Sequence, residues 1–120
     1  MNKIQAYQSF WTNFFLPVYD ENYVPENAQM PYITYESAFD SFGSDIALTV
    51  SLWYRGMSWA DASQKALQIS EYIGRGGALV PYDDGAFWIR RGQPFAQRMG
   101  GSNDDMVKRI VLNVVVEFID

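Results

Sequence analysis

Cysteine and histidine are both absent from this chain of 120 residues. Without cysteine there can be no disulfide and no thiolate metal site. Without histidine the chain lacks the commonest general base and the commonest nitrogen ligand for metals. These absences argue against a hydrolase and against a zinc protein. We therefore expect a protein that is not an enzyme and that binds no metal and no cofactor.

Long apolar runs are missing as well. No stretch approaches the roughly 20 residues that a membrane-spanning helix needs, and Gln5, Gln8 and Thr12 interrupt the apolar positions near the N-terminus. With 48% hydrophobic and 17% aromatic residues, the chain lies far from the composition of disordered proteins. The sequence predicts one soluble, intracellular domain over residues 1–120, with no membrane contact.

Positive charge is scarce in the first half of the chain. Residues 1–60 carry six acids and only two basic residues, Lys3 and Arg55, whereas residues 61–120 carry eight acids and seven basic residues. The net charge of −5 makes nucleic acid an unfavourable partner, because such binding depends on neutralising phosphates. Two interpretations of the uneven charge remain open: an acidic surface of one copy meets a more basic surface of another, or the charges are simply solvated.

Aromatic residues at helical spacing predict an N-terminal helix over residues 3–15, which Pro17 ends. Six large side chains would be too many to hide beneath one short helix. We therefore expect some of them to form core and others to meet a neighbouring copy; the stripe consists of Ile4, Tyr7, Phe10, Trp11, Phe14 and Phe15. Phe10, Trp11 and Phe14 are the candidates for an interface.

The remaining chain reads as loops, strands and one more helix. The pattern predicts a loop at 16–31, a strand at 32–36, an irregular turn at 38–45 and a strand at 46–54. A helix at 59–73 follows. The last part of the chain is predicted to form a hairpin with arms at 78–82 and 86–90, a loop at 91–105 and a strand at 106–119. The helix carries an apolar stripe, which Leu67 joins and which is otherwise Trp59, Ala62, Ala66, Ile69 and Ile73.

These elements predict an α+β fold with a mainly antiparallel sheet of four or five strands. The helix at 59–73 is expected to cover one face, and the N-terminal helix is expected to pack at an edge. Pro81 places the first arm of the hairpin at an edge of the sheet. Trp53 is expected under the second helix or at a subunit boundary.

Few residue patterns suggest chemistry. The adjacent carboxylates Asp83-Asp84 and Asp104-Asp105 are better read as turn and capping residues than as a catalytic pair, because neighbours on an extended chain point to opposite faces. The glycines at 74–77 are better read as a helix stop than as a phosphate cradle, since they lack a following Lys-Ser or Lys-Thr pair.

One basic segment with an aromatic residue stands out, and its members are Arg90, Arg91, Phe95 and Arg98. Arginine forms forked hydrogen bonds with carboxylates and with phosphates alike. The segment is expected to contact a partner protein, with nucleic-acid contact or a solvated loop as the alternatives. The acidic loop bearing Asp20, Glu21 and Glu26 on another copy is the expected complement.

The sequence also resembles a known family. Two features carry the resemblance. One is the segment Met30-Pro31-Tyr32-Ile33-Thr34-Tyr35-Glu36, which follows a polar stretch with spaced prolines, and the other is the order helix, loop, strands, helix, strands. In both, the chain is similar to the small tail-terminator and head-tail joining proteins of long-tailed bacteriophages. The resemblance carries no residue-specific functional motif.

The resemblance implies a structural protein that forms a homo-oligomeric ring, for which six copies is one option. Such a ring caps the tail tube and joins it to the head connector, so the expected partners are the tail-tube and head-connector proteins. The expected location is the virion tail or the head-tail junction, after assembly in the bacterial host cytoplasm. Another minor tail or capsid component, a cytoplasmic adaptor unrelated to phages, or a small enzyme remain as alternatives.

Overall fold

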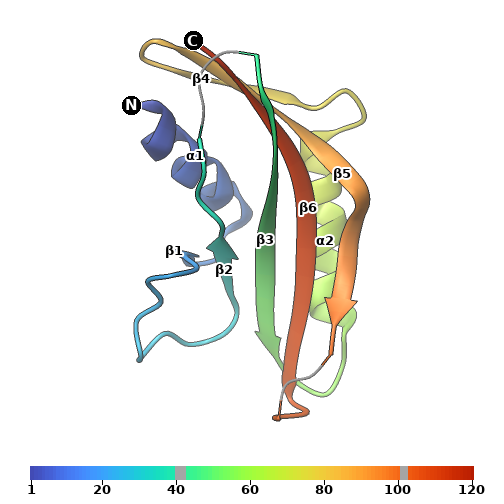
Figure 1. The fold of residues 1–120 in the computed structure, drawn as a ribbon. Helices are drawn as coiled ribbons and strands as arrows, with labels where there is room; N and C mark the ends of the chain where they lie inside the picture. Colours follow the sequence, from blue (N-terminus) through green and yellow to red (C-terminus); the bar gives the residue numbers. More distant parts are fainter. Residues whose placement is uncertain (40–42, 101–102) are drawn as a thin grey trace.

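A computed structural model describes residues 1–39, 43–100 and 103–120. Within them the chain forms two α-helices, one short 3-10 helix and a six-stranded sheet in the order β1-β2-β3-β6-β5-β4 (Figure 1). The elements are α1 (Lys3–Trp11), η1 (Thr12–Phe14), β1 (Val18–Asp20), β2 (Tyr32–Tyr35), β3 (Asp45–Arg55), α2 (Ala60–Ile73), β4 (Ala78–Tyr82), β5 (Gly85–Met99) and β6 (Val107–Ile119). The predicted α+β class is confirmed, but the sheet has six strands in place of four or five. The predicted turn at 38–45 includes residues 40–42, which lie outside the described residues.

The two central strands are those that the sequence predicts most clearly. β3 and β6 pair antiparallel along the whole of β3, from Asp45 opposite Glu117 to Arg55 opposite Val107. Alternate side chains face the core, as the apolar alternation predicts, and Ser51 and Val111 are in addition buried on the other face. The buried positions on this core face are Leu48, Val50, Leu52, Ile110, Leu112, Val114, Val116 and Phe118.

The sixth strand lies inside the predicted loop at 16–31. β1 runs parallel to β2, with Val18 opposite Ile33. The Ile33 N–H donates to the Pro17 carbonyl at 2.8 Å, and the Glu21 N–H donates to the Tyr35 carbonyl at 3.0 Å. A strand of three residues is too short to show an alternating pattern, and the neighbouring proline is a loop signal. The sequence therefore did not predict β1. Because β1 runs parallel to β2, the sheet is mixed.

The predicted loop at 91–105 is wrong for its first part, because β5 continues to Met99. The register with β6 shifts between Arg91 and Ala96, so the extra residues form a bulge. In this bulge a Cβ on Gly92 would lie 2.9 Å from the Asn113 carbonyl oxygen, so the backbones approach closely. Glycine and proline usually signal loops in a sequence, yet both are tolerated at a bulge. The hairpin arms at 78–82 and 86–90 are confirmed, and β4 lies at the predicted edge.

The second helix lies on the core face, as predicted. Its start signal is confirmed, because the Ser58 hydroxyl accepts the Ala60 N–H at 3.0 Å. The buried stripe comprises Ala62, Ala66, Ile69 and Ile73. Leu67 does not belong to this stripe, since its side chain is 60% exposed. One residue advances a helix by about 100°, which turns Leu67 away from the contact made by Ala66.

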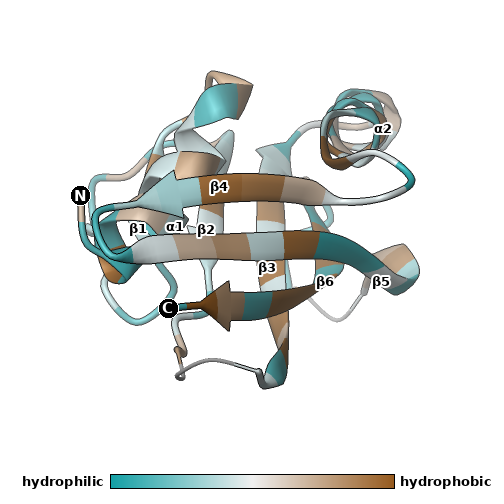
Figure 2. Cartoon of the chain, turned by 90° about the horizontal axis from the view of Figure 1, so that it is seen from above, coloured by the Kyte–Doolittle hydropathy of each residue, from teal (hydrophilic) through white to brown (hydrophobic). Residues whose placement is uncertain are grey.

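The first helix is not confined to an edge, which corrects the prediction. In the view from above, α1 lies near β1, β2 and β4 (Figure 2), and its Phe10 ring lies 5.8 Å from the Tyr72 ring of α2. The Tyr7 ring lies 6.0 Å from the Tyr35 ring on β2 and 5.8 Å from the Phe87 ring on β5. Because β3 and β6 separate those two strands, one ring reaches both only if the sheet curls around α1. The helix therefore fills the core face beside α2.

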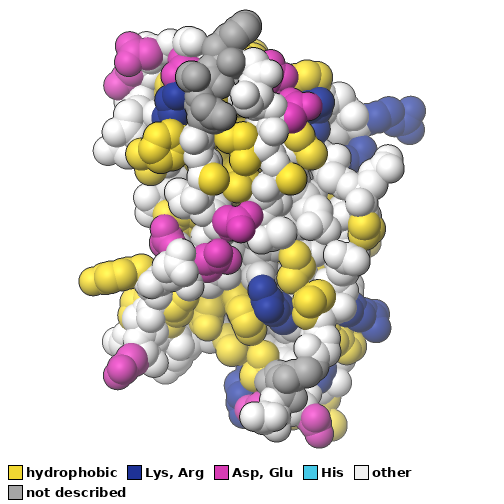
Figure 3. Space-filling model, viewed as in Figure 1, with side chains coloured by type: hydrophobic (Ala, Val, Ile, Leu, Met, Phe, Trp, Pro, Cys, Tyr) yellow, Lys and Arg dark blue, Asp and Glu magenta, His cyan; other side chains and the backbone are white. Residues whose placement is uncertain are grey.

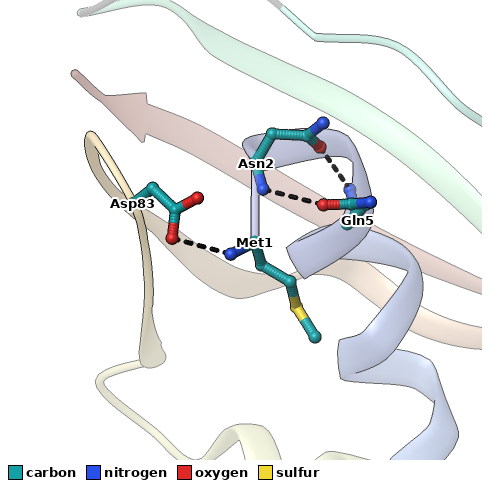
Figure 4. Close-up of polar contacts among 4 residues, drawn as sticks. All are labelled: Met1, Asn2, Gln5 and Asp83. Atoms are coloured by element: carbon teal, nitrogen blue, oxygen red, sulfur yellow. Dashed lines mark hydrogen bonds and ion pairs between the residues drawn. The ribbon is translucent and has the colours of Figure 1, made fainter.

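Polar contacts hold the start of α1 in place (Figure 4). The Asn2 side chain accepts the Gln5 N–H at 2.9 Å, and the Gln5 side chain accepts the Asn2 N–H at 3.0 Å, which is a capping box. The amino group of Met1 lies 2.7 Å from the Asp83 carboxylate, in the turn between β4 and β5. These contacts tie the N-terminal helix to the hairpin at the sheet edge, and they confirm a turn role for the Asp83-Asp84 pair.

Candidate functional site

The basic segment lies on an open edge of the sheet. β4 pairs with β5 only as far as Ala78 opposite Ile89, so from Arg90 onward β5 has no strand partner on its outer side among the described residues. Arg90 is already engaged within the chain. Its guanidinium lies 4.1 Å from the centre of the Trp88 ring, and Nη2 lies 2.7 Å from the Asp45 carboxylate. Arg90 therefore has an acidic partner within its own chain, and its contact with an acid of another copy stays a prediction.

Arg91 and Arg98 are exposed on this edge and point to the helix side of the sheet. Arg91 Nη1 donates to the Ser70 hydroxyl at 2.9 Å, and the Arg98 guanidinium lies 5.1 Å from the centre of the Trp59 ring. Among the described residues neither arginine has a carboxylate within ion-pair distance. Each guanidinium has five N–H donors, so most donors of Arg91 and Arg98 remain available to a partner.

An apolar groove separates α2 from the end of β5. Its volume is about 260 Å³, enough for one large side chain, and Leu67 and Phe95 form its apolar walls. Arg98 borders the groove at one end. A second hollow at the β5 bulge shares Phe95 and is bordered by Arg75 and Arg91. Phe95 is half-buried and lines both hollows, the first with Arg98 and the second with Arg75, Arg90 and Arg91.

The acidic segment lies at the opposite edge of the sheet. Asp20 ends β1, and its carboxylate accepts the Asn22 N–H at 2.9 Å while its carbonyl accepts the Tyr23 N–H at 2.9 Å. This turn holds Tyr23 with 84% of its surface exposed. Glu21 and Glu26 are exposed on either side of it. The sequence indicated the acids as candidates but not Tyr23. A large aromatic residue within a polar loop that contains spaced prolines was the feature that could have indicated it.

The two edges differ sharply in charge. Residues 4–54 contain six acids and no basic residue, and residues 85–103 contain three arginines and no acid. Figure 3 shows acidic side chains gathered over β1 and β2 and basic ones projecting at the margin of β5. Since β1 and β5 lie on opposite sides of the central strands, the uneven charge of the sequence becomes an acidic edge and a basic edge.

The aromatic face of α1 and η1 offers no surface to a partner, which corrects the prediction for its three candidates. The side chains of Phe10, Trp11 and Phe14 are at most 3% exposed and belong to the core. The curled sheet gives them more cover than one flat helix contact could. Of the predicted stripe, only Phe15 and Ile4 are exposed.

The face of the sheet away from the helices carries a polar and aromatic cluster. Trp53 lies here and not under α2, and its indole N–H donates to the Thr34 hydroxyl at 2.9 Å. Arg109 lies 4.8 Å from the centre of the Trp53 ring, and its Nε donates to the Ser51 hydroxyl at 3.1 Å. These contacts engage the Trp53 indole N–H and the Nε of Arg109 within the chain, and Arg109 also lines a hollow that Glu21 borders. The cluster therefore has a structural role in covering the second face of the sheet.

Within the described part of the chain, no three carboxylates converge as a metal-binding group. Asp104 accepts the Met106 N–H at 2.9 Å and pairs with Arg55, which confirms its predicted turn role. Neither helix among these residues has the length and apolar character that a bilayer crossing requires. Comparison with protein-family models, curated proteins and solved structures finds no match. The function of the protein must therefore be inferred from the geometry and charge of the chain.

Proposed function

We propose that this protein is a structural, non-catalytic tail terminator of a long-tailed phage, whose copies join edge to edge in a ring. The observation that carries the proposal is the opposite charge of two unlike edges of one sheet. The acidic edge has Glu21 and Glu26 exposed, and the basic edge has Arg91 and Arg98 exposed without carboxylate partners.

The two edges lie at the same level of the sheet, which favours a side-by-side arrangement of copies. One continuous row of paired residues crosses the sheet from β1 to β5 and consists of Tyr19, Thr34, Ser51, Val111 and Gln97. With about 4.8 Å between neighbouring strands, the row is roughly 19 Å wide. A copy placed beside another therefore brings its acidic edge against the basic edge of its neighbour with little displacement along the strands.

Contact between two unlike surfaces joins copies head to tail and not in a two-fold dimer. A heterologous contact leaves one free edge at each end of any open chain of copies. Such a chain closes into a ring when the rotation between copies divides a full turn without displacement along the axis, and otherwise it forms an open filament. A two-fold dimer through either edge would instead place like charges together, which is unfavourable. The charge distribution thus favours a cyclic oligomer.

The resemblance of the sequence to tail-terminator and head-tail joining proteins supplies the biological setting. In this setting the ring binds the end of the tail tube, stops its growth and presents a surface to the head connector. The partners are further copies of the chain, the tail-tube protein and the head-connector protein, and the location is the head-tail junction of the virion. The mechanism is binding without catalysis.

Two measurements on the purified protein test the proposal. Light scattering over a concentration series should give a discrete oligomer, which electron microscopy should show as rings. Added to the polymerising tail-tube protein of the same phage, the rings should sit at tube ends and shorten the tubes. A chain that stays monomeric and leaves tube length unchanged would refute the proposal. Rings that bind the connector or a capsid protein but not tube ends would favour another head-tail component.

A further inference from the structure

The groove between α2 and β5 has the chemistry of a receptor for an acidic, aromatic segment. Leu67, which is 60% exposed, and the half-buried Phe95 line it, and an exposed leucine beside a cleft is typical of a surface that loses water on binding. Arg98 stands at the groove, and Arg91 stands at the adjoining hollow beyond Phe95. The pattern along this edge is therefore arginine, apolar groove, arginine.

The turn after β1 presents the complementary pattern. Tyr23 projects from the turn held by Asp20, with Glu21 two residues before it and Glu26 three residues after it. The pattern along this edge is acid, aromatic ring, acid. Because hydrogen bonds to Asp20 already fix the backbone at Tyr23, little conformational entropy remains to be lost on binding.

Phe15 is the obvious competitor for the groove, since its side chain is 85% exposed. It has no acid within four residues on either side. Placing Phe15 against the arginines would leave their charges uncompensated. Charge complementarity therefore selects Tyr23.

We infer that Tyr23 of one copy inserts into the groove between α2 and β5 of the next copy, with Glu21 and Glu26 facing Arg91 and Arg98. This inference rests on the proposed ring and names the contact that closes it. Tyrosine is among the residues that most often dominate the binding energy of interfaces, because its large, rigid ring loses little entropy when it is buried. The copy that occupies the groove is a second copy of this chain, since the complementary segment lies on the opposite edge of the same sheet.

Cross-linking tests the contact directly, because the chain has no native cysteine. The double variant Tyr23→Cys with Leu67→Cys should give, on mild oxidation, a ladder of covalent oligomers that ends at the ring and disappears on reduction. The matched control, Phe15→Cys with Leu67→Cys, has an equally exposed first position and should remain uncross-linked. All three positions lie on the surface, so neither pair should disturb folding.

A mixing experiment tests whether the contact is heterologous. Tyr23→Ala removes the inserted ring, and Leu67→Glu spoils the groove, so each variant alone should associate at least ~10-fold more weakly than the parent. Mixed in equal amounts, the two should form a pair of one copy each and no ring, because only one intact contact remains between them. Phe15→Ala should assemble like the parent.

The outcomes separate this inference from the proposed function. Rings that assemble and cap tubes while the Tyr23 and Leu67 cysteines stay uncross-linked would overturn the inference and leave the proposed function standing. Cross-linking through the Phe15 pair but not the Tyr23 pair would also overturn it. A parent chain that stays monomeric at every concentration, alone and with tubes, would overturn both.

Discussion

At the scale of single residues, the core contains polar atoms that no group in the described part of the chain satisfies. The Tyr7 hydroxyl and the Trp11 indole N–H are both buried, and neither has a hydrogen-bond partner among the described residues. Burial raises the pKa of Tyr7 well above its ordinary value, an effect that nearby Trp11 partly offsets and that Glu36 and Tyr35 reinforce. A buried hydroxyl without a hydrogen-bond partner lowers stability, because its loss of contact with water is not offset by a hydrogen bond within the protein. Tyr7 therefore serves the fold through its ring and not through its hydroxyl.

Replacing Tyr7 with phenylalanine should change how stability depends on pH. The folded pKa of Tyr7 exceeds the unfolded value of 10.0, so above pH 10 the unfolded chain releases the proton that the folded chain keeps. The free energy of unfolding then falls as pH rises. Tyr7→Phe removes this contribution, so its stability should fall less steeply than that of the parent.

Urea unfolding at a series of pH values from about 8 to 11 measures the effect of Tyr7→Phe. Near pH 8 the variant should be within ~1 kcal/mol of the parent or more stable, since only an unsatisfied group is lost. Tyr23→Phe provides the control for removing an exposed hydroxyl. Equal alkaline slopes for Tyr7→Phe and the parent would show that the buried hydroxyl does not resist ionisation.

At the scale of elements, a helix or strand could be predicted from the sequence when it buries one face and exposes the other. β3, β6 and α2 each bury one face against a continuous core, so the period of their apolar residues was visible in the sequence. β1 is too short to have a period, and the second half of β5 hides its strand character behind Gly92 and Pro94 in a bulge. β1 and the part of β5 that extends beyond β4 are open edges of the sheet, so the sequence indicated charged candidates there without showing that strands carry them.

Ala66 provides a test of the packing of α2 on the sheet. Its side chain is 6% exposed and faces the core, so Ala66→Glu would place a charge in a close contact between helix and sheet. We expect this change to lower the free energy of unfolding by about 2 kcal/mol or more. Gln68→Glu, which adds the same group at an exposed position two residues on, should cost no more than ~0.5 kcal/mol. Denaturant melts of both variants compare them, and equal midpoints would mean that Ala66 does not face the sheet.

At the scale of the whole molecule, a sheet with unlike edges is both a hazard and a means of assembly. Open edges invite pairing with other chains, and charge on an edge restricts which partner is accepted. Here the acids at β1 and the arginines at β5 repel their own kind and attract each other. The same distribution that prevents indiscriminate stacking of like edges thus favours one contact, repeated from copy to copy.

Charge along the β5 edge should therefore control how assembly responds to salt. Arg91→Ser combined with Arg98→Ser removes two exposed charges, and Arg90 stays because it pairs with Asp45 and packs on Trp88. Charges at the rim of an interface act mainly on the association rate and its salt dependence. The parent should associate more weakly as ionic strength rises and the Debye length falls below about 10 Å. The double variant should remain folded, associate more slowly at low salt, and respond less to added salt.

Sedimentation or light scattering at about 0.05 and 0.5 M NaCl, with stopped-flow association, measures both quantities. Gln93→Ser combined with Gln97→Ser is the matched control, because it shortens two side chains of the same edge strand without changing charge. If the arginine variant and the parent show the same rate and the same salt response, the β5 edge takes no electrostatic part in assembly. The contact would then have to depend on the apolar groove alone, because the aromatic residues of α1 that the sequence offered as the other candidates are buried in the core.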